Sequence, residues 1–186
     1  QDSDCRIIGP SHLNRKIACT MIITYPLLLD GGLSNELERQ GCDLNQTLWT
    51  AKLLESNPEA IILAHLIYLQ SGVGCIITSS YQATLSGFIA IGYNKNSAKG
   101  LILKSVQLAE EARKRFLLIN PNAPKPLIAA SIGPYGAYLA DGSEYRGDYI
   151  ISDQELTDFH EPRINLLDNS TADILACETI PGFQEA

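Results

Sequence analysis

Short apolar runs alternate with segments of helical periodicity along most of this chain, and this order restricts the folds that the chain can adopt. Four runs have the length and composition of buried strands: 26–29, 75–78, 127–131 and 174–177. They lack a strict apolar–polar alternation, which is typical of parallel strands covered on both faces. Parallel neighbours need crossover connections, usually helices. The order therefore predicts an α/β fold with a parallel sheet in one domain.

Two of the intervening segments carry clear helix signals. Segment 57–71 opens with Asn57 as the expected N-cap and Pro58 at the first helical position, and Gly72 follows as a left-handed cap. Segment 97–116 places its apolar residues on roughly one face and its charged residues outside. Both segments are therefore expected to be helices that pack against the sheet.

A third helix is expected before the last apolar run. Ser152 is followed three residues later by Glu155, which is the pattern of a capping box. The apolar residues after it continue to Leu167, and Pro162 is expected to kink the helix.

Charge argues against two classes of partner. The chain has 14 Lys and Arg residues against 21 Asp and Glu residues, so its formal net charge is −7. This balance disfavours binding to phosphate backbones and to anionic membrane surfaces. No apolar run approaches the roughly 18–20 residues of a membrane-spanning helix. We therefore expect neither nucleic acid nor a membrane as a partner.

The cysteines indicate a reducing compartment. The five are widely scattered, with no C-x-x-C motif and no histidine at zinc-ligand spacing. We expect them to be free thiols in a cytoplasmic protein rather than a disulfide framework. They are Cys5, Cys19, Cys42, Cys75 and Cys177.

The first 20 residues differ from the rest. They are polar and mixed in charge, with no apolar stretch like that of a signal peptide, and the only methionine is Met21. One interpretation is that the sequence is cut from a longer chain. The favoured one is that Met21 is the natural start, so that 1–20 is extraneous or disordered and 21–186 is the domain.

Small and polar residues follow each apolar run at its carboxyl end, where α/β folds place their sites. They are Asp30-Gly31-Gly32, 78–82, 132–136 and Glu178-Thr179. The amino ends of the runs show nothing comparable. This one-sided distribution is typical of a ligand-binding or catalytic face.

Each of these residues also has a purely structural interpretation. Asp30 either caps a helix that begins near Ser34 or contacts a ligand. Ser80 and Tyr81 either satisfy loop backbone groups or contact a ligand. Glu178 directly follows an apolar run, where a carboxylate is costly unless it is paired or bound, which favours a functional role.

Residues 133–149, here called the lid segment, join the third run to the next helix. The segment is rich in tyrosine and glycine and carries several charges, and we expect an ordered lid. The three histidines, His12, His65 and His160, are expected to have packing or surface roles.

Several blocks of the sequence, considered together, resemble one known family. They include L-L-L-D-G-G-L-S-N-E-L-E-R-Q-G at 27–41, N-P-E-A at 57–60 and I-I-T-S-S-Y-Q-A-T at 76–84. Two more are S-I-G-P-Y-G-A-Y-L-A-D-G-S-E-Y-R-G-D-Y at 131–149 and L-A-C-E-T-I-P at 175–181. The pattern resembles the homocysteine S-methyltransferases, in the branch that uses S-methylmethionine.

The resemblance implies a fold and an activity. The family fold is a (β/α)8 TIM barrel of about 250 residues, so about four β/α units would make this chain the N-terminal half of a barrel. The implied reaction moves a methyl group from a sulfonium donor, S-methylmethionine or S-adenosylmethionine, to homocysteine, and forms methionine. Asp30, Gly31, Ser80 and Glu178 match family positions that hold homocysteine.

The resemblance also implies zinc, held in the family by three cysteine thiolates that bind the homocysteine sulfur. A metal of this kind deprotonates the thiol near neutral pH. The thiolates belong to a G-x-N-C-like motif and to a G-G-C-C motif, and neither is present in this sequence. No metal ligand and no catalytic residue is therefore assigned, and the chain is expected to be inactive in this form.

Two other interpretations stay open. One is a non-catalytic half-barrel that binds or interacts after loss of the zinc site, and the other is a different barrel enzyme that shares only the fold. The coding sequence after Ala186 would distinguish the non-catalytic half-barrel from the methyltransferase, because only the methyltransferase is expected to continue into the cysteine motifs. Open sheet edges in a half-barrel also predict self-association.

Overall fold

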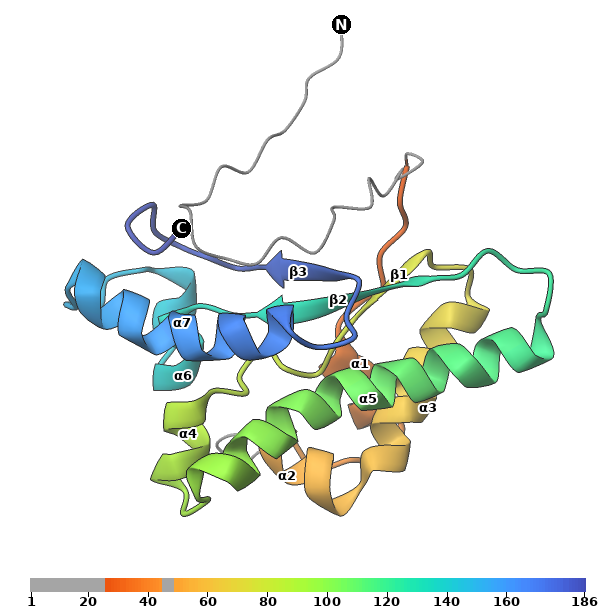
Figure 1. Cartoon of the computed structure of the whole chain (residues 1–186), viewed down its shortest axis with the longest axis horizontal. Coiled ribbons are helices and arrows are strands. Elements are labelled where there is room, and N and C mark those ends of the chain that lie inside the picture. The colour runs from red at the N-terminus through yellow and green to blue at the C-terminus, as the bar shows by residue number, and fades with distance from the viewer. Residues whose placement is uncertain (1–25, 45–48) are drawn as a thin grey trace, which may run out of the picture.

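The computed structural model describes residues 26–44 and 49–186, so the expectations for residues 1–20 lie outside the described part. Helices and strands alternate as expected, with further short helices between them (Figure 1). The elements are α1 (Leu33–Arg39), α2 (Trp49–Ser56), α3 (Pro58–Gln70), β1 (Cys75–Ile77), α4 (Leu85–Ala90), α5 (Lys95–Ile119), β2 (Leu127–Ile132), α6 (Tyr135–Leu139), the 3-10 helix η1 (Ser143–Tyr145), α7 (Asp153–Asp168) and β3 (Ile174–Cys177).

The sheet has three parallel strands in the order β1-β2-β3. Cys75 of β1 lies opposite Leu127 of β2, and Ala129 of β2 lies opposite Ile174 of β3. Because all three strands run in the same direction, their carboxyl ends meet at one edge of the sheet. The α/β class with a parallel sheet is therefore confirmed.

The first expected strand forms only in part, which corrects the prediction of four strands. Within run 26–29, Leu29 makes a single isolated parallel bridge to Cys75. Leu28 and Leu29 keep 59% and 49% of their surface exposed. The described residues therefore form three strands and one isolated bridge.

The helices cover the sheet from one side (Figure 1). Each strand contacts the helix that precedes it: α3 packs on β1, α5 on β2 and α7 on β3. The central strand β2 is almost wholly buried, whereas β3 is half-buried and ends in the exposed Cys177. The burial expected for all runs therefore holds for β2 but not for β3.

The predicted start of α3 is confirmed. Asn57 accepts a hydrogen bond from the backbone N–H of Ala60 at 3.4 Å, and Pro58 occupies the first helical position. After the helix, Gly72 has a φ of +93°, the left-handed conformation that glycine adopts at low cost.

The capping box of α7 is also confirmed. The Ser152 hydroxyl accepts from the Glu155 backbone N–H, and the Glu155 carboxylate accepts from the Ser152 backbone N–H. Pro162 lies inside α7, which continues past it to Asp168. Helix α5 begins earlier than predicted, because Asn94 caps it by accepting from the backbone N–H groups of Asn96 and Ser97 at 3.0 and 2.9 Å.

A buried ion pair joins α5 to the sheet. The Arg113 guanidinium, 8% exposed, donates to the Asp173 carboxylate. The same Asp173 oxygen accepts from the backbone N–H of Ile128 at 2.8 Å, and Arg113 also donates to the Pro126 carbonyl at 3.2 Å. These contacts join α5 to β2 and to the residue that precedes β3.

No helix in the described ranges 26–44 and 49–186 has the length and apolar character that crossing a membrane requires.

His65 of α3 has the packing role expected for it, but at an energetic cost. It is fully buried, and neither ring nitrogen has a hydrogen-bond partner among the described residues. Burial lowers the pKa of His65 from 6.5 to about 4. The imidazole is therefore held neutral in the core near pH 7.

This burial predicts acid sensitivity. Below pH 6.5 the unfolded chain binds a proton at His65 that the folded chain refuses until about pH 4, so His65 reduces stability progressively over that window as the pH falls. The His65→Leu variant is expected to lose this dependence and to be more stable at pH 7 by about 1–3 kcal/mol, since the buried nitrogens are removed. Urea unfolding at pH 4.5–7 measures both effects, and an unchanged pH profile would contradict the assignment.

Candidate functional site

A hollow of about 270 Å³ lies where the carboxyl ends of the strands meet. It is bounded by the turn before α1, the residues after β1 and β3, and the lid segment. Its lining residues are Gly31, Gly32, Leu33, Ser34, Ile77, Thr78, Ser79, Tyr81, Tyr145, Glu178 and Thr179. The structure therefore brings together the polar residues that the sequence places at separate strand ends.

Asp30 directly precedes Gly31, which lines the hollow, and does not cap α1. The N-cap of α1 is Gly32, which makes no side-chain capping bond, so the capping interpretation of Asp30 is wrong. Instead, Asp30 Oδ2 accepts from the backbone N–H of Ile77 at 2.9 Å, at the end of β1. Its Oδ1 is buried without a hydrogen-bond partner among the described residues. A buried carboxylate oxygen with no donor is costly and favours a ligand that supplies one.

The electrostatics of Asp30 favour a cationic ligand group. Burial, followed by the nearby negative charge of Glu178, raises the pKa of Asp30 from 3.8 to about 6, against the opposing effect of the Ile77 hydrogen bond. A cation beside the two carboxylates would relieve both the burial cost and their mutual repulsion. An ammonium group has the donors and the charge for this position.

Glu178 lies at the end of β3 and is fixed by its neighbours. Its carboxylate accepts from the Ser131 hydroxyl, and its backbone N–H donates to the Ile132 carbonyl at 3.2 Å. The next residue, Thr179, has a φ of +57°, a left-handed conformation that is strained for a β-branched residue. Tyr81 is hydrogen-bonded to the Thr179 side chain. The strained turn therefore sits directly beside the candidate carboxylate.

Ser80 satisfies a backbone group, whereas Ser79 lines the hollow. Ser80 is fully buried, donates to the Ser131 carbonyl at 2.7 Å and lies 2.8 Å from the Thr78 hydroxyl. Ser79 lines the hollow, and its buried hydroxyl has no partner among the described residues. Sequence reasoning singled out Ser80 and missed Ser79, although the run 78–82 contains both. The role of Ser80 in substrate binding stays a prediction.

Gly31 lines the hollow at a position where a larger side chain would require Tyr68 to move. A Cβ on Gly31 would lie 3.2 Å from the hydroxyl of Tyr68. That hydroxyl donates to the Gly32 carbonyl at 2.9 Å and fixes the turn. The small residue therefore keeps the wall of the hollow open beside Asp30.

The lid segment contains short helices of its own. It contains α6 and η1, and three of its tyrosines pack around Phe159 of α7 or around one another, with ring centroids 5.0–5.7 Å apart. Tyr145 lines the hollow and keeps 78% of its surface exposed. The expected order is confirmed, whereas its action as a lid stays a prediction.

The described residues do not fit the family's zinc ion. They contain no group of three His, Cys, Asp or Glu side chains that could hold a metal ion. Cys75 is buried in the sheet, and burial raises the pKa of its thiol to about 11, which disfavours the thiolate. Cys177 is exposed at the end of β3, and Cys42 follows α1.

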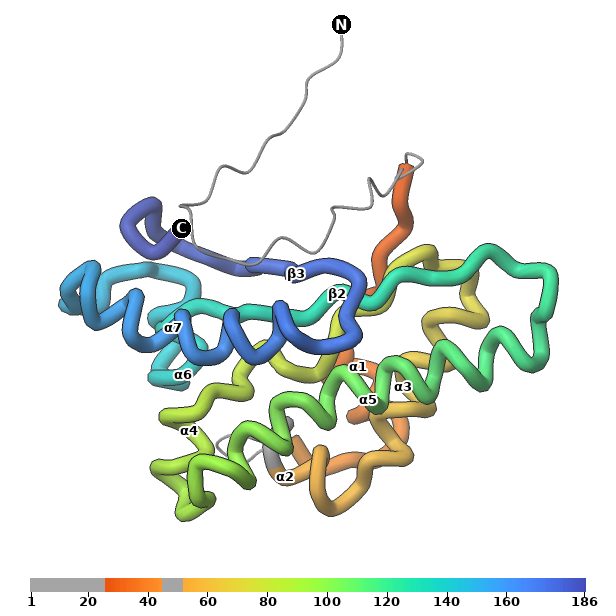
Figure 2. Tube along the Cα trace, viewed as in Figure 1, coloured from red at the N-terminus to blue at the C-terminus, as the bar shows by residue number. Residues whose placement is uncertain are grey.

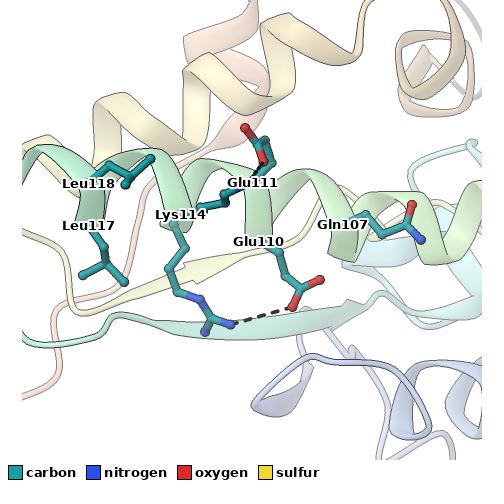
Figure 3. Close-up of a pocket in the computed structure, with 7 residues that line it drawn as sticks. Gln107, Glu110, Glu111, Lys114, Leu117 and Leu118 are labelled. Atoms are coloured by element: carbon teal, nitrogen blue, oxygen red, sulfur yellow. Dashed lines mark ion pairs between the residues drawn. The ribbon is translucent and has the colours of Figure 1, made fainter.

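A larger hollow of about 630 Å³ lies along α5, away from the strand ends (Figure 3). Its walls come from one helix only, and its polar groups pair with each other, as Arg113 does with Glu110 at 4.0 Å. No side chains from other elements converge there. The smaller hollow at the strand ends is therefore the better candidate site.

Comparisons with known proteins point to one family. The profile of a family described as homocysteine S-methyltransferase matches residues 27–186. Homocysteine S-methyltransferase YbgG of Bacillus subtilis is 55% identical over 88% of this chain and 53% of its own length. Homocysteine S-methyltransferase of Escherichia coli is 54% identical over 86% and 51%.

A solved structure of the metallated form of the homocysteine methyltransferase MmuM from Escherichia coli has a TM-score of 0.82 at 53% identity, and the match covers 86% of this chain and 56% of that one. The chain thus spans about half the length of the relatives that it matches.

Asp30 makes a testable contribution to stability. Between about pH 4 and pH 6 the carboxyl is ionised in the unfolded chain but still binds its proton when folded, so the folded state loses stability as the pH rises through this window. Asp30→Asn retains an acceptor for Ile77 and is expected to abolish this loss. Urea midpoints of variant and wild type across pH 4–7 test it, and parallel curves would refute it. His65 acts in the opposite sense in both proteins, so the difference between them isolates Asp30.

Proposed function

The chain belongs to the homocysteine S-methyltransferase family, and we propose that it supplies the homocysteine-binding part of a methyl transfer from a sulfonium donor to the homocysteine sulfur. The observation that carries this proposal is the buried, unpartnered Oδ1 of Asp30 beside the carboxylate of Glu178. In this proposal the ammonium group of homocysteine lies between the two carboxylates. Ser79 and the Gly31 turn line the remainder of the pocket.

The chemistry needs orientation more than acid–base catalysis. After the homocysteine thiol has lost its proton to solvent, its sulfur attacks the methyl carbon of the sulfonium, a C–S bond forms as the old one breaks, and a neutral thioether leaves with the electron pair. Holding the amino acid by its ammonium fixes the direction in which its side chain extends. Such positioning of the two reactants lowers the entropic part of the activation free energy.

We propose S-methylmethionine or S-adenosylmethionine as the donor and methionine as the product. Zinc would supply a thiolate-stabilising charge in the family, but the described residues do not fit it. On these residues the chain binds and orients homocysteine without activating its sulfur. We therefore expect homocysteine binding but no methyl transfer from this chain by itself.

A non-catalytic binding module is the second candidate function, and the lack of a thiolate cluster among the described residues favours it. Both candidates predict that homocysteine binds between Asp30 and Glu178. They differ in turnover once the remainder of a family barrel is supplied.

A cytoplasmic location is proposed on the basis of the free thiols of Cys42, Cys75 and Cys177.

Homocysteine binding tests the proposal directly. Titration calorimetry is expected to show binding that strengthens as the pH rises through about 6, because Asp30 must ionise to pair with the ammonium. Asp30→Asn and Glu178→Gln are each expected to weaken binding about tenfold. Asp158→Asn, at an exposed position of α7, is the matched control. Equal affinity in all four proteins would refute the assignment.

The exposed edge predicts self-association. Strand β3 has no partner on its outer side within the described sheet, and its surface is half-exposed. Such edges pair with other chains when nothing covers them. Light scattering coupled to size exclusion is expected to give a mass that rises with protein concentration, and a constant monomer mass would contradict this.

A further inference from the structure

The segment after β3 ends with a side chain that is held unusually firmly. The Glu185 side chain is 2% exposed and sits where three donors converge. Its Oε1 accepts from the Tyr135 backbone N–H and lies 2.7 Å from His160 Nε2, and its Oε2 accepts from the Tyr149 hydroxyl. Burial alone would raise the pKa of Glu185, but these hydrogen bonds outweigh it and hold the pKa below its ordinary value. Glu185 is therefore a carboxylate at neutral pH.

The tautomer of His160 follows from its other neighbour. Arg163 Nη2 lies 3.1 Å from His160 Nδ1. A guanidinium only donates, so Nδ1 accepts and the ring proton is on Nε2, from which it is donated to Glu185. Arg163 is itself buried and donates to the Gly133 carbonyl at 2.6 Å and to the Tyr81 carbonyl at 3.3 Å. The chain Arg163–His160–Glu185 thus links α7 to the ends of the strands.

These contacts lie at the two ends of the lid segment. Tyr135 begins α6 and Tyr149 ends the segment, and both donate to the same carboxylate. Figure 2 shows the C-terminal turn returning to the part of the chain that contains α6 and the start of α7. Between these ends, Tyr145 lines the candidate homocysteine pocket, whose other wall includes Glu178 and Thr179.

We propose that Glu185 and His160 form a carboxylate latch that positions the lid segment against Glu178 and Thr179 and thereby shapes the homocysteine pocket. They act as positioning residues, since neither lines that pocket. This inference rests on the proposed function for its effect on homocysteine, but its effect on the lid segment stands independently.

The latch requires a carboxylate rather than an amide. All three partners of Glu185 donate, so an acceptor-only group satisfies them together. In Glu185→Gln, the amide NH₂ would face a donor, and at least one contact would be lost. His160→Leu removes both the donor to Glu185 and the acceptor for Arg163, whereas His160→Gln retains one of each.

Two measurements test the latch. Trypsin cleaves after lysine and arginine. Arg146 is an exposed cleavage site within the lid segment, and Lys114 is an exposed cleavage site within α5. Glu185→Gln and His160→Leu are expected to increase the rate of cleavage at Arg146 about tenfold with no change at Lys114. They are also expected to weaken homocysteine binding to the folded protein about fivefold. His160→Gln is expected to restore both, and Glu161→Gln, an exposed neighbour on α7, is the control.

The outcomes separate the two proposals. Unchanged cleavage at Arg146, or an equal increase at Lys114, would overturn the latch, because the residues would then contribute only to global stability. Faster cleavage with unchanged homocysteine affinity would also overturn it, since the lid segment would not shape the pocket. If the wild-type chain binds no homocysteine, the proposed function fails, and the trypsin comparison still decides whether Glu185 holds the lid segment.

Discussion

Parallel pairing of β2 with both of its neighbours is the constraint on which the rest of the structure depends. It fixes the direction of every strand and so gathers the carboxyl ends of β1, β2 and β3 at one edge. Two aspartates reinforce it from opposite ends: Asp173 binds the backbone N–H of Ile128 near the amino end, and Asp30 binds that of Ile77 at the carboxyl end. The first has Arg113 as its counter-ion. Asp30 contacts no cationic side chain among the described residues. This difference distinguishes the structural carboxylate of Asp173 from the candidate ligand-binding carboxylate of Asp30.

The candidate site keeps features that folding alone would not favour. Within the described part of the chain, Asp30 has a buried oxygen without a donor and Ser79 a buried hydroxyl without a partner, and Thr179 has a left-handed backbone. Each feature costs stability, and such costs concentrate where a protein binds or reacts. In the neighbouring network, His160 contacts both Glu185 and Arg163, although Nε of Arg163 has no partner among the described residues. Rigid support around an unsatisfied pocket is the arrangement expected when a ligand completes the hydrogen bonds.

Local sequence signals predicted the parts of the fold that depend on neighbouring residues. The Asn57–Pro58 start of α3 and the Ser152–Glu155 capping box formed as expected, because a cap is satisfied within one turn of its own helix. Predictions that depended on distant partners were less successful. The run 26–29 forms a single bridge to Cys75 instead of a strand, and Leu28 and Leu29 stay exposed. The sequence around Asp30 is compatible with a helix cap, but in the fold its carboxylate accepts from the backbone N–H of Ile77 in β1 instead.

The sequence by itself determined the order of strands and helices, the edge at which the polar residues would meet and, through its motifs, the family. These follow from periodicity, capping chemistry and residue identity, which are all local properties of the chain. Only the tertiary structure decided that Ser79 rather than Ser80 faces the hollow, that Asp30 is left with an unpartnered oxygen, and that Glu185 ties the lid segment to α7. The physical reason is that hydrogen-bond satisfaction in a buried site depends on which donors the fold brings within reach, and those donors lie far apart in the sequence.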